Sequence, residues 1–383
     1  MTAGRHTALC LCVLLALQAC SDPTPSLDAH NPPVQLSQWQ LLHLDTVNNT
    51  LVLDVSSHAY DLATPLFSDY ALKLRTIRLP EGQQARPDSD GQLAFPVGTV
   101  ISKTFYYPRG PDTTKEHVGW SENLQYGFDG EKLDLDQVYL LETRLLVHQH
   151  NGWTALPYVW NAEQSDATLQ IAGDIRRLTL HKQEEQIPLT YIVPNRNECA
   201  ACHRPDQNRP EISPLGPTIR NLNRMVGFGP HQSQNQLEIW QAHGLLSALP
   251  LAEHRDAAAL WEPQRPLTPE QELERRARSY LDVNCAHCHQ PGGSADTSGL
   301  FLNIDESSPT RLGICKPPVA AGRGTGGHRF SIVPGSPEQS ILVHRMLSTE
   351  VGVLMPELGR TLVHEEGLEL VKAWITRLSG DCD

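Results

Sequence analysis

The sequence predicts a multidomain protein in which an N-terminal all-β domain is followed by mainly α-helical regions. Between residues 35 and 193, β-branched or alternating apolar stretches are separated by clusters of Gly, Pro, Asn and Asp, as expected for strands joined by turns. After Pro194 this pattern gives way to helical spacing and loops. The chain has 383 residues, 39% of them hydrophobic, which is enough for two or three domains with their own cores. The clearest expected strands are Thr50–Val55, Leu72–Leu79, Thr99–Tyr107, Val138–His148 and Ile187–Val193.

The first 20 residues have the layout of a secretory signal, with a short polar start, an apolar run and small residues before Cys20. The apolar run is too short to cross a membrane. Because Leu17 to Cys20 resembles the cleavage motif of bacterial lipoproteins, we expect Cys20 to carry lipid; the alternative is cleavage nearby without lipidation. In such proteins a serine like Ser21 permits sorting to the outer membrane. We therefore expect an exported lipoprotein that faces the periplasm and is anchored in the outer membrane.

The rest of the chain divides by composition. Residues 21–34 are polar and contain prolines, which is typical of a flexible tether between lipid and folded body. In the region 194–250, Leu237 and Trp240 indicate a short amphipathic helix. Repeated prolines then mark residues 251–267 as a linker, and a further domain is expected over residues 268–383.

Two helices are predicted in the region after residue 267. Thr268 is a suitable N-cap and Pro269 a suitable first helical residue for a helix that leads to Cys285. Near the C-terminus, apolar residues recur at helical spacing before a glycine stop. These residues are Leu368, Val371, Ile375 and Leu378, followed by Gly380.

The formal net charge is −13, and no run of lysine and arginine residues offers a stripe for binding phosphates. Nucleic acid is therefore not an expected partner. The acidity suits contact with a basic partner protein, but it is also an ordinary solubility charge.

The strongest chemical signal is a pair of C-x-x-C-H motifs. In such a motif two thiols add to the vinyl groups of a haem, and the histidine that follows ligates the iron. We therefore expect two haem c groups, with His203 and His289 as iron ligands. The motifs are Cys199-Ala200-Ala201-Cys202-His203 and Cys285-Ala286-His287-Cys288-His289.

Two other kinds of site use paired cysteines. A zinc ion can take four thiolates from two such pairs, but a histidine directly follows each second cysteine, and bare pairs tend to oxidise in an exported protein. A thioredoxin-like redox site is disfavoured because neither motif follows a strand of a βαβ unit. Haem attachment is the favoured interpretation.

The sixth iron ligands are predicted less directly. For the second haem we expect Met355, between the two C-terminal helices, with Met346 as the competing methionine. For the first haem the ligand stays open, and an open iron would permit peroxide chemistry. The donors to consider there are Met225, His231 and His243 downstream and His58 and His148 in the β domain.

The chain contains nine cysteines. Cys10 and Cys12 belong to the signal, Cys20 is assigned to lipid, and four belong to the motifs. Cys315 and Cys382 remain, and in an oxidising compartment two such thiols are expected to pair as a disulfide.

Longer segments carry a resemblance to a known family. They are Tyr60 to Asp69, Gly152 to Asn161, both C-x-x-C-H motifs, Leu312 to Cys315 with the glycine-rich loop after it, and Met355 to Arg360. Through them the chain resembles a largely uncharacterised family of bacterial two-haem c-type cytochrome lipoproteins. The C-terminal part also resembles class I cytochrome c, which implies mainly α cytochrome c-type haem domains and His289 with Met355 as an axial pair. Family members are often encoded beside a predicted parallel β-helix protein, which implies a partner of that kind.

Three functions are compatible with these features. The first is electron transfer between redox protein partners through two haems, on a protein attached to the membrane by lipid. The second is a dihaem peroxidase or small-molecule oxidase that uses an open first haem. The third is a β module that binds a ligand or partner and carries the haems as attached redox groups. The first is preferred.

Overall fold

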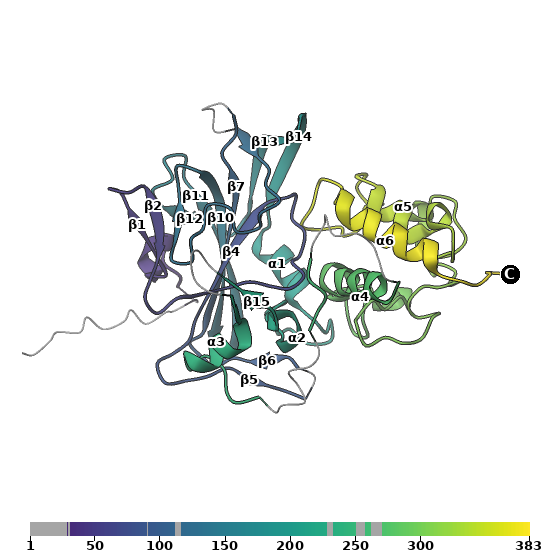
Figure 1. The fold of residues 1–383 in the computed structure, drawn as a ribbon, viewed down its shortest axis with the longest axis horizontal. Helices are drawn as coiled ribbons and strands as arrows, with labels where there is room; N and C mark the ends of the chain where they lie inside the picture. Colours follow the sequence, from purple (N-terminus) through teal and green to yellow (C-terminus); the bar gives the residue numbers. More distant parts are fainter. Residues whose placement is uncertain are drawn as a thin grey trace, which may run out of the picture.

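The computed structural model describes residues 29, 31–89, 91–111, 116–227, 233–249, 257–261 and 270–383. Figure 1 shows a β-rich body and, beside it, a unit of helices and loops formed by the C-terminal residues. The signal segment with Cys20, the residue His231, and the prolines 263, 266 and 269 lie outside the described residues. No helix in the described part of the chain is both long and apolar enough to cross a membrane.

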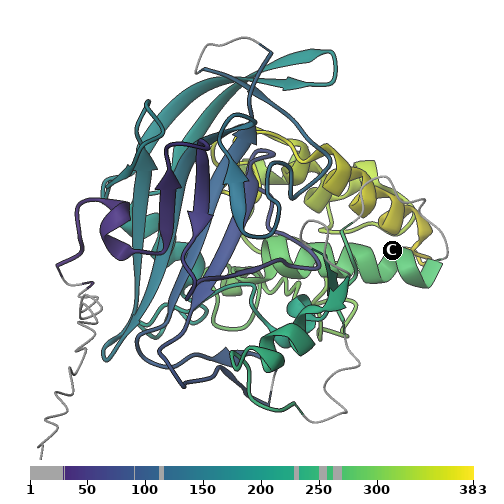
Figure 2. The same cartoon turned by 60° about the vertical axis from the view of Figure 1, so that its left-hand side comes forward.

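A six-stranded antiparallel sheet forms the centre of the body (Figure 2). Successive residues of its strands face opposite sides. Phe105 therefore packs in one core cluster and its neighbour Tyr106 in another. In sheet order the strands are β12 (Ala167–Leu169), β11 (Gly152–Trp160), β10 (Val138–Gln149), β7 (Val100–Pro108), β4 (Leu72–Arg78) and β3 (His58–Tyr60).

Smaller sheets extend the body. Strands β13 (Asp174–Lys182) and β14 (Glu185–Val193) form a hairpin with β8 (His117–Gly119) beside it, and a second three-stranded sheet holds β1 (Leu42–Asp45), β2 (Thr50–Leu53) and β9 (Lys132–Asp134). Two short ladders complete the body: β5 (Arg86–Pro87) with β6 (Leu93–Ala94), and β15 (Met225–Val226) with β16 (Gln234–Asn235).

The prediction of mainly α-helical cytochrome domains after the β domain is wrong. The structure is mostly sheet, 21% of it is helical, and no helical cytochrome domain is evident in the described residues. In the region 194–250 the helices are short: α1 (Arg196–His203), α2 (Ile219–Leu222) and α3 (Gln236–Ala242). After residue 268 they are α4 (Glu270–Leu281), α5 (Ile341–Leu347) and α6 (Glu365–Arg377).

Two physical causes explain why helical domains do not form here. First, α2 and α3 do not form a core of their own, because Leu222 and Trp240 share a cluster with Ile77 and Ile101 of the sheet. Second, the stretch between α4 and α5 is rich in glycine, proline and serine, which favour turns over helices. After a π-helical turn that continues α4 (Asp282–Ala286), the helical elements there are short 3-10 turns: Asp296–Ser298, Gly322–Thr325 and Pro337–Gln339.

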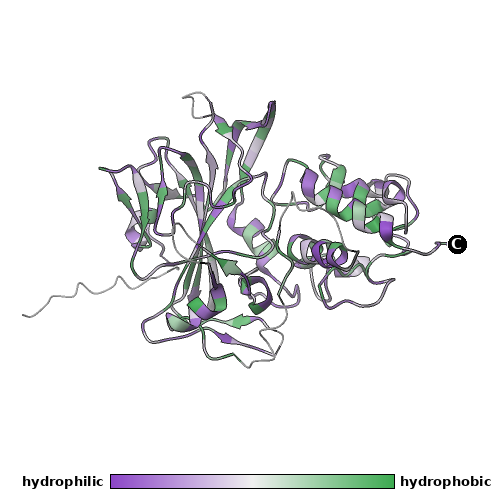
Figure 3. Cartoon of the chain, in the orientation of Figure 1, coloured by the Kyte–Doolittle hydropathy of each residue, from purple (hydrophilic) through white to green (hydrophobic). Residues whose placement is uncertain are grey.

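Helices α4, α5 and α6 enclose a small apolar core that includes Leu281, Met346 and Trp374. Helices α4 and α6 both carry hydrophilic as well as hydrophobic residues (Figure 3), so each buries one side only. They cross closely at Gly367, where an added Cβ would lie 2.4 Å from the hydroxyl of Tyr280. Glycine is therefore required at this crossing.

Cys315 and Cys382 form a disulfide with their Cα atoms 5.1 Å apart, as the sequence predicts. The bond joins the C-terminal end to a loop 67 residues earlier. We expect replacement of both cysteines by serine to lower the free energy of unfolding by about 2–4 kcal/mol, because an open loop of this length leaves the unfolded chain more freedom. Denaturant unfolding of the two proteins without reductant measures this difference, and an unchanged midpoint would contradict it.

Candidate functional site

Both C-x-x-C-H motifs contribute to a single cavity of about 1000 Å³. This volume is at the upper end of the roughly 300–1,000 Å³ of ordinary small-molecule sites. The first motif supplies Cys199, Cys202 and His203 to the lining, and the second supplies Cys285 and His287. Side chains far apart in the sequence therefore surround one space.

The first motif occupies helix α1, which begins directly after strand β14. Asn195 caps this helix by accepting hydrogen bonds from the backbone N–H groups of Asn197 and Glu198, at 2.9 and 3.0 Å. The carboxylate of Glu198 in turn accepts the N–H of Asn195 at 2.8 Å. This reciprocal capping fixes the helix start, and the helix ends at His203.

The second motif begins in a π-helical turn, Asp282–Ala286, that continues α4. Two buried or half-buried side chains fix this turn to other segments. Asn284 accepts the backbone N–H of Phe67 at 2.8 Å, and Asp282 accepts that of Ile304 at 2.9 Å. The turn that carries Cys285 is thus bound directly to the β-rich body.

The loops that follow the two motifs are hydrogen-bonded to each other. The N–H of Gln207 donates to the carbonyl of Gly292 at 2.8 Å, and the amide of Gln290 donates to the carbonyl of Pro205 at 3.4 Å. Gly292 has a φ of +79°, and an added Cβ would lie 3.3 Å from a carboxylate oxygen of Asp206. The motifs are therefore neighbours, although His203 at the end of the first is far in the sequence from Cys285 at the start of the second.

His203 is held in the state that an iron ligand needs. Its Nδ1 lies 2.8 Å from the carbonyl oxygen of Ser213. Because a carbonyl only accepts, Nδ1 must carry the proton, which leaves the lone pair on Nε2. Burial, and then the charge of Lys103, lower the pKa of His203 to about 3, so the ring is neutral at neutral pH.

His289 has a similar setting in the second motif. Burial lowers its pKa to about 4, while a hydrogen bond to the backbone of Leu300 opposes that shift. A backbone partner for the second ring nitrogen is the usual way that proteins orient a ligating imidazole. Unlike His203, His289 does not itself line the shared cavity, among the lining residues that the structure describes.

The four motif cysteines are free. Burial raises the pKa of Cys202 to about 11 and that of Cys285 to about 12, and it also raises the pKa of Cys199 and Cys288. In these apolar surroundings the free thiols stay protonated at neutral pH. Within the described residues, no three His, Cys, Asp or Glu side chains come together as a group that could hold a metal ion.

Met355 and Met346 both line the cavity. The loop that carries Met355 is fixed by the buried guanidinium of Arg360, which donates to the Met355 carbonyl at 2.7 Å. The same guanidinium donates to the backbone carbonyls of Arg345, Met346, Ser348 and Leu362 at 3.0–3.2 Å. Arg360 is therefore a positioning residue for Met355.

Asp69 connects this loop to the β-rich body. Its buried carboxylate accepts the backbone N–H of Thr361 at 2.8 Å and that of Leu362 at 2.7 Å. Burial raises the pKa of Asp69, and these hydrogen bonds oppose that shift. The resemblance segment Tyr60 to Asp69 thus ends on a contact with the loop that presents Met355.

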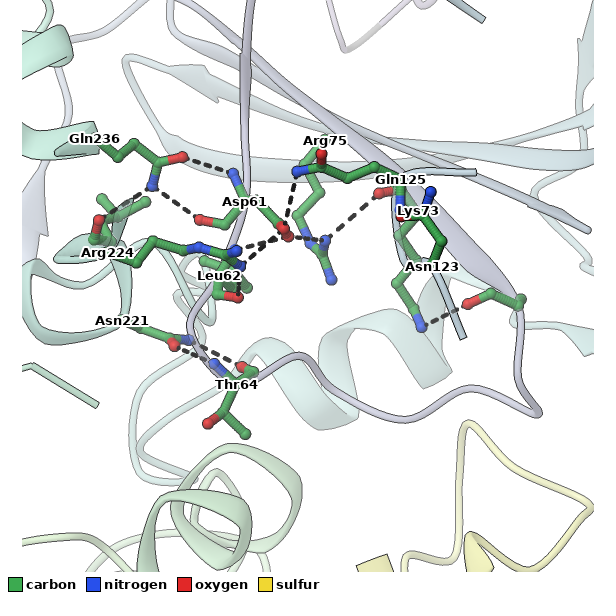
Figure 4. Close-up of polar contacts among 12 residues, drawn as sticks. Asp61, Leu62, Thr64, Lys73, Arg75, Asn123, Gln125, Asn221, Arg224 and Gln236 are labelled. Carbon is green, nitrogen blue, oxygen red and sulfur yellow. Dashed lines mark hydrogen bonds and ion pairs between the residues drawn. The ribbon is translucent and has the colours of Figure 1, made fainter. Parts of the chain in front are cut away.

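The start of the same segment contacts the region of the first motif. Figure 4 shows the buried carboxylate of Asp61 between Arg75 and Arg224, at 3.2 and 2.8 Å, with the amide of Gln236 on the Asp61 backbone. Asn221 of α2 accepts the backbone N–H of Thr64 at 2.9 Å. These contacts explain why α2 and α3 pack on the sheet.

Four of the five donors that the sequence offered for the first haem lie in described segments, and the structure places them away from the cavity. The ring of His58 lies edge-on to that of His243 at 5.3 Å, and His148 stacks on Trp153 at 4.5 Å. Met225 is 54% exposed. None of these four lines the cavity.

The cavity wall also contains three basic residues that were not predicted from the sequence as part of a site: Arg75, Lys103 and Arg144. A signal was present, because each of these cations falls in the middle of a predicted strand. A charge in the middle of a strand that is expected to be buried indicates an unusual environment.

His364 lies among aromatic rings at the edge of the cavity. It stacks on Phe67 at 4.1 Å, and its Nδ1 lies 3.0 Å from the hydroxyl of Tyr280. Burial lowers the pKa of His364 from 6.5 to about 3, although the carboxylate of Glu366 opposes the shift. The folded protein therefore keeps this ring neutral where the unfolded chain protonates it.

This lowered pKa predicts a loss of stability in acid. Between pH 6.5 and 3 the unfolded chain binds a proton on His364 that the folded chain does not, so the contribution present above pH 6.5 is lost as the pH falls. At pH 5 the loss is about 2 kcal/mol. Denaturant unfolding at pH 7 and pH 5 measures how far the free energy of unfolding falls. We expect this fall to be about 2 kcal/mol smaller in His364→Gln than in the wild type. Equal losses in both proteins would contradict the prediction.

Comparisons with protein-family models, with curated proteins and with solved structures found no match to this chain.

Proposed function

We propose that this protein is a two-haem c-type cytochrome that transfers electrons between redox protein partners. The observation that supports the proposal most is the placement of both C-x-x-C-H motifs around one cavity, with the loops after them hydrogen-bonded to each other. Two redox groups attached there would be neighbours, as relay of electrons between them requires. The resemblance to two-haem lipoproteins supports the same function.

The residues of the chain fit this role. Cys199 and Cys202 would attach one haem, and Cys285 and Cys288 the other, since all four thiols are free. His203 and His289 are neutral and oriented by backbone groups. Bound haem supplies one-electron chemistry, and the protein tunes it through the axial ligands and through burial.

Met355 would complete the coordination of the second haem. A thioether ligand raises the reduction potential and leaves no open position for a substrate. Arg360 and Asp69 hold the loop of Met355 against the body, and this arrangement favours a carrier over a catalyst at that site.

The attachment and partners form part of the same proposal. We place the protein on the periplasmic side of the outer membrane, anchored by lipid on Cys20. Its partners would be redox proteins, among them a parallel β-helix protein encoded nearby. The net charge of −13 would favour basic surfaces on these partners.

Spectroscopy of the purified, haem-loaded protein tests the function. We expect two low-spin, six-coordinate haems, reduction of both by a common donor, and no turnover of peroxide with a reduced donor. A high-spin haem in the resting protein that binds cyanide and turns over peroxide would instead establish the dihaem peroxidase.

A further inference from the structure

The three cations of the cavity wall are opposite one another in the central sheet. Lys103 of β7 pairs in register with Arg75 of β4 on one side and with Arg144 of β10 on the other. Directly opposed residues share one face and lie about 5 Å apart, and like charges in such positions repel. A row of three cations therefore requires nearby anions to offset the repulsion, or a ligand that the cations bind.

The two outer cations are compensated. Arg75 forms an ion pair with Asp61 at 3.2 Å, and Arg144 forms a two-point ion pair with Glu142 at 2.5 and 2.8 Å. Lys103 is different. Within the described residues its side chain has no ion pair and donates no hydrogen bond, and its Nζ lies over the ring of Phe105, 5.3 Å from the ring centre.

Lys103 lines the cavity beside the first motif. After burial, its charge is the largest influence on the pKa of His203, and it also affects Cys199 and Cys202. Lys103 therefore lies on the wall of the cavity in which Cys199 and Cys202 would attach a haem.

A second property suits a ligand. Burial first, and then Arg144 and Arg75, lower the pKa of Lys103 to about 7. A substantial fraction of the side chain is therefore a neutral amine near pH 7, with a lone pair on Nζ.

On the basis of the proposed function, we infer that the amine of Lys103 is the sixth ligand of the first haem. The side chain is a nitrogen donor without an ion pair or hydrogen bond among the described residues, on the sheet face that lines the same cavity as Cys199, Cys202 and His203. The two histidines of the β domain that the sequence offered as ligands contact other rings, His148 that of Trp153 and His58 that of His243. His287 also lines the cavity, but it lies between the two cysteines that attach the second haem.

Three variants test this inference on the haem-loaded, full-length protein. Lys103→Leu removes the donor, and Lys103→Arg keeps the charge but has no available lone pair. Lys73→Leu is the matched control, because Lys73 lies on the same sheet face as Arg75 but outside the cavity lining, where it donates to the carbonyl of Ala71 at 3.0 Å. The readouts are the mass of attached haem, circular dichroism, electron paramagnetic resonance and carbon monoxide binding.

We expect both Lys103 variants to keep two attached haems and a folded body, while one of the haems becomes high-spin and binds carbon monoxide after reduction. Lys73→Leu should retain two low-spin haems. The inference is overturned if Lys103→Leu leaves both haems low-spin, if Lys103→Arg behaves as the wild type, or if His287→Ala produces the high-spin haem instead. A wild-type protein without haem at the first motif would contradict the proposed function itself, and the mass shows this separately.

Discussion

Replacing Cys199 and Cys202 together with alanine is expected to halve the covalently bound haem, from two groups to one. The reason is that each thioether bond needs a cysteine sulfur, and this variant leaves only Cys285 and Cys288. Intact mass under denaturing conditions measures the change, because non-covalent haem is lost there.

The matched control is replacement of Cys315 and Cys382 by serine. This pair forms the disulfide and lines no part of the cavity within the described residues, so the variant should retain both haems. Two haems on the Cys199/Cys202 variant, or one haem on the disulfide variant, would contradict the assignment of the motifs.

Replacing Arg360 with leucine is expected to destabilise the loop of Met355 and to remove that residue from the second iron. The guanidinium is 6% exposed and donates to five backbone carbonyls, which would lose their partner in the variant. Hydrogen bonds from a charged group contribute roughly 1.5–3 kcal/mol each, so we expect the free energy of unfolding to fall by at least about 3 kcal/mol.

Two measurements check this expectation. Denaturant unfolding gives the loss of stability, and the reduction potential of the second haem should fall because a thioether ligand raises it. Arg323→Leu is the control, since its ion pair with Glu350 is exposed and should contribute at most about 1 kcal/mol. An Arg360→Leu protein with wild-type stability and potential would show that the clamp does not position Met355.

The strands were largely predictable because the residues that form them are local signals. The expected strand Leu72–Leu79 is β4, Thr99–Tyr107 is β7 and Val138–His148 is β10, each within one residue at both ends. The last helix was predictable for the same reason, since its apolar residues recur at helical spacing. The helix before Cys285 was predicted from its capping residues Thr268 and Pro269, which lie outside the described residues. Alternation and periodicity depend on neighbours in the sequence.

The mainly helical architecture was the wrong part of the prediction, and its cause is tertiary. A C-x-x-C-H motif requires one helical turn and not a helical domain, and the segments that follow each motif are turns and loops. Nothing local to Leu222 or Trp240 indicates that they pack with Ile77 and Ile101 of the sheet. Long-range packing of this kind overrides the local pattern.

The candidate site divides in the same way. The five-residue motifs of cysteine and histidine can be recognised in any sequence. The pairing of Cys315 with Cys382 could also be predicted, because these two cysteines remained after the others had been assigned. Lys103 and Arg360 could not be recognised from the sequence as residues of the cavity. Lys103 lies there because of the register between β7 and β10, and Arg360 because the loop that contains it folds back on Met355. Their chemical role depends on burial, which no short segment reveals.

The most direct test of the account is the haem content of the mature protein made in a host that assembles c-type cytochromes. We predict an intact mass that corresponds to the polypeptide with two haems, and a red colour that remains with the protein during extraction with acidified acetone. A colourless protein, or porphyrin that passes into the acetone, would contradict the central claim.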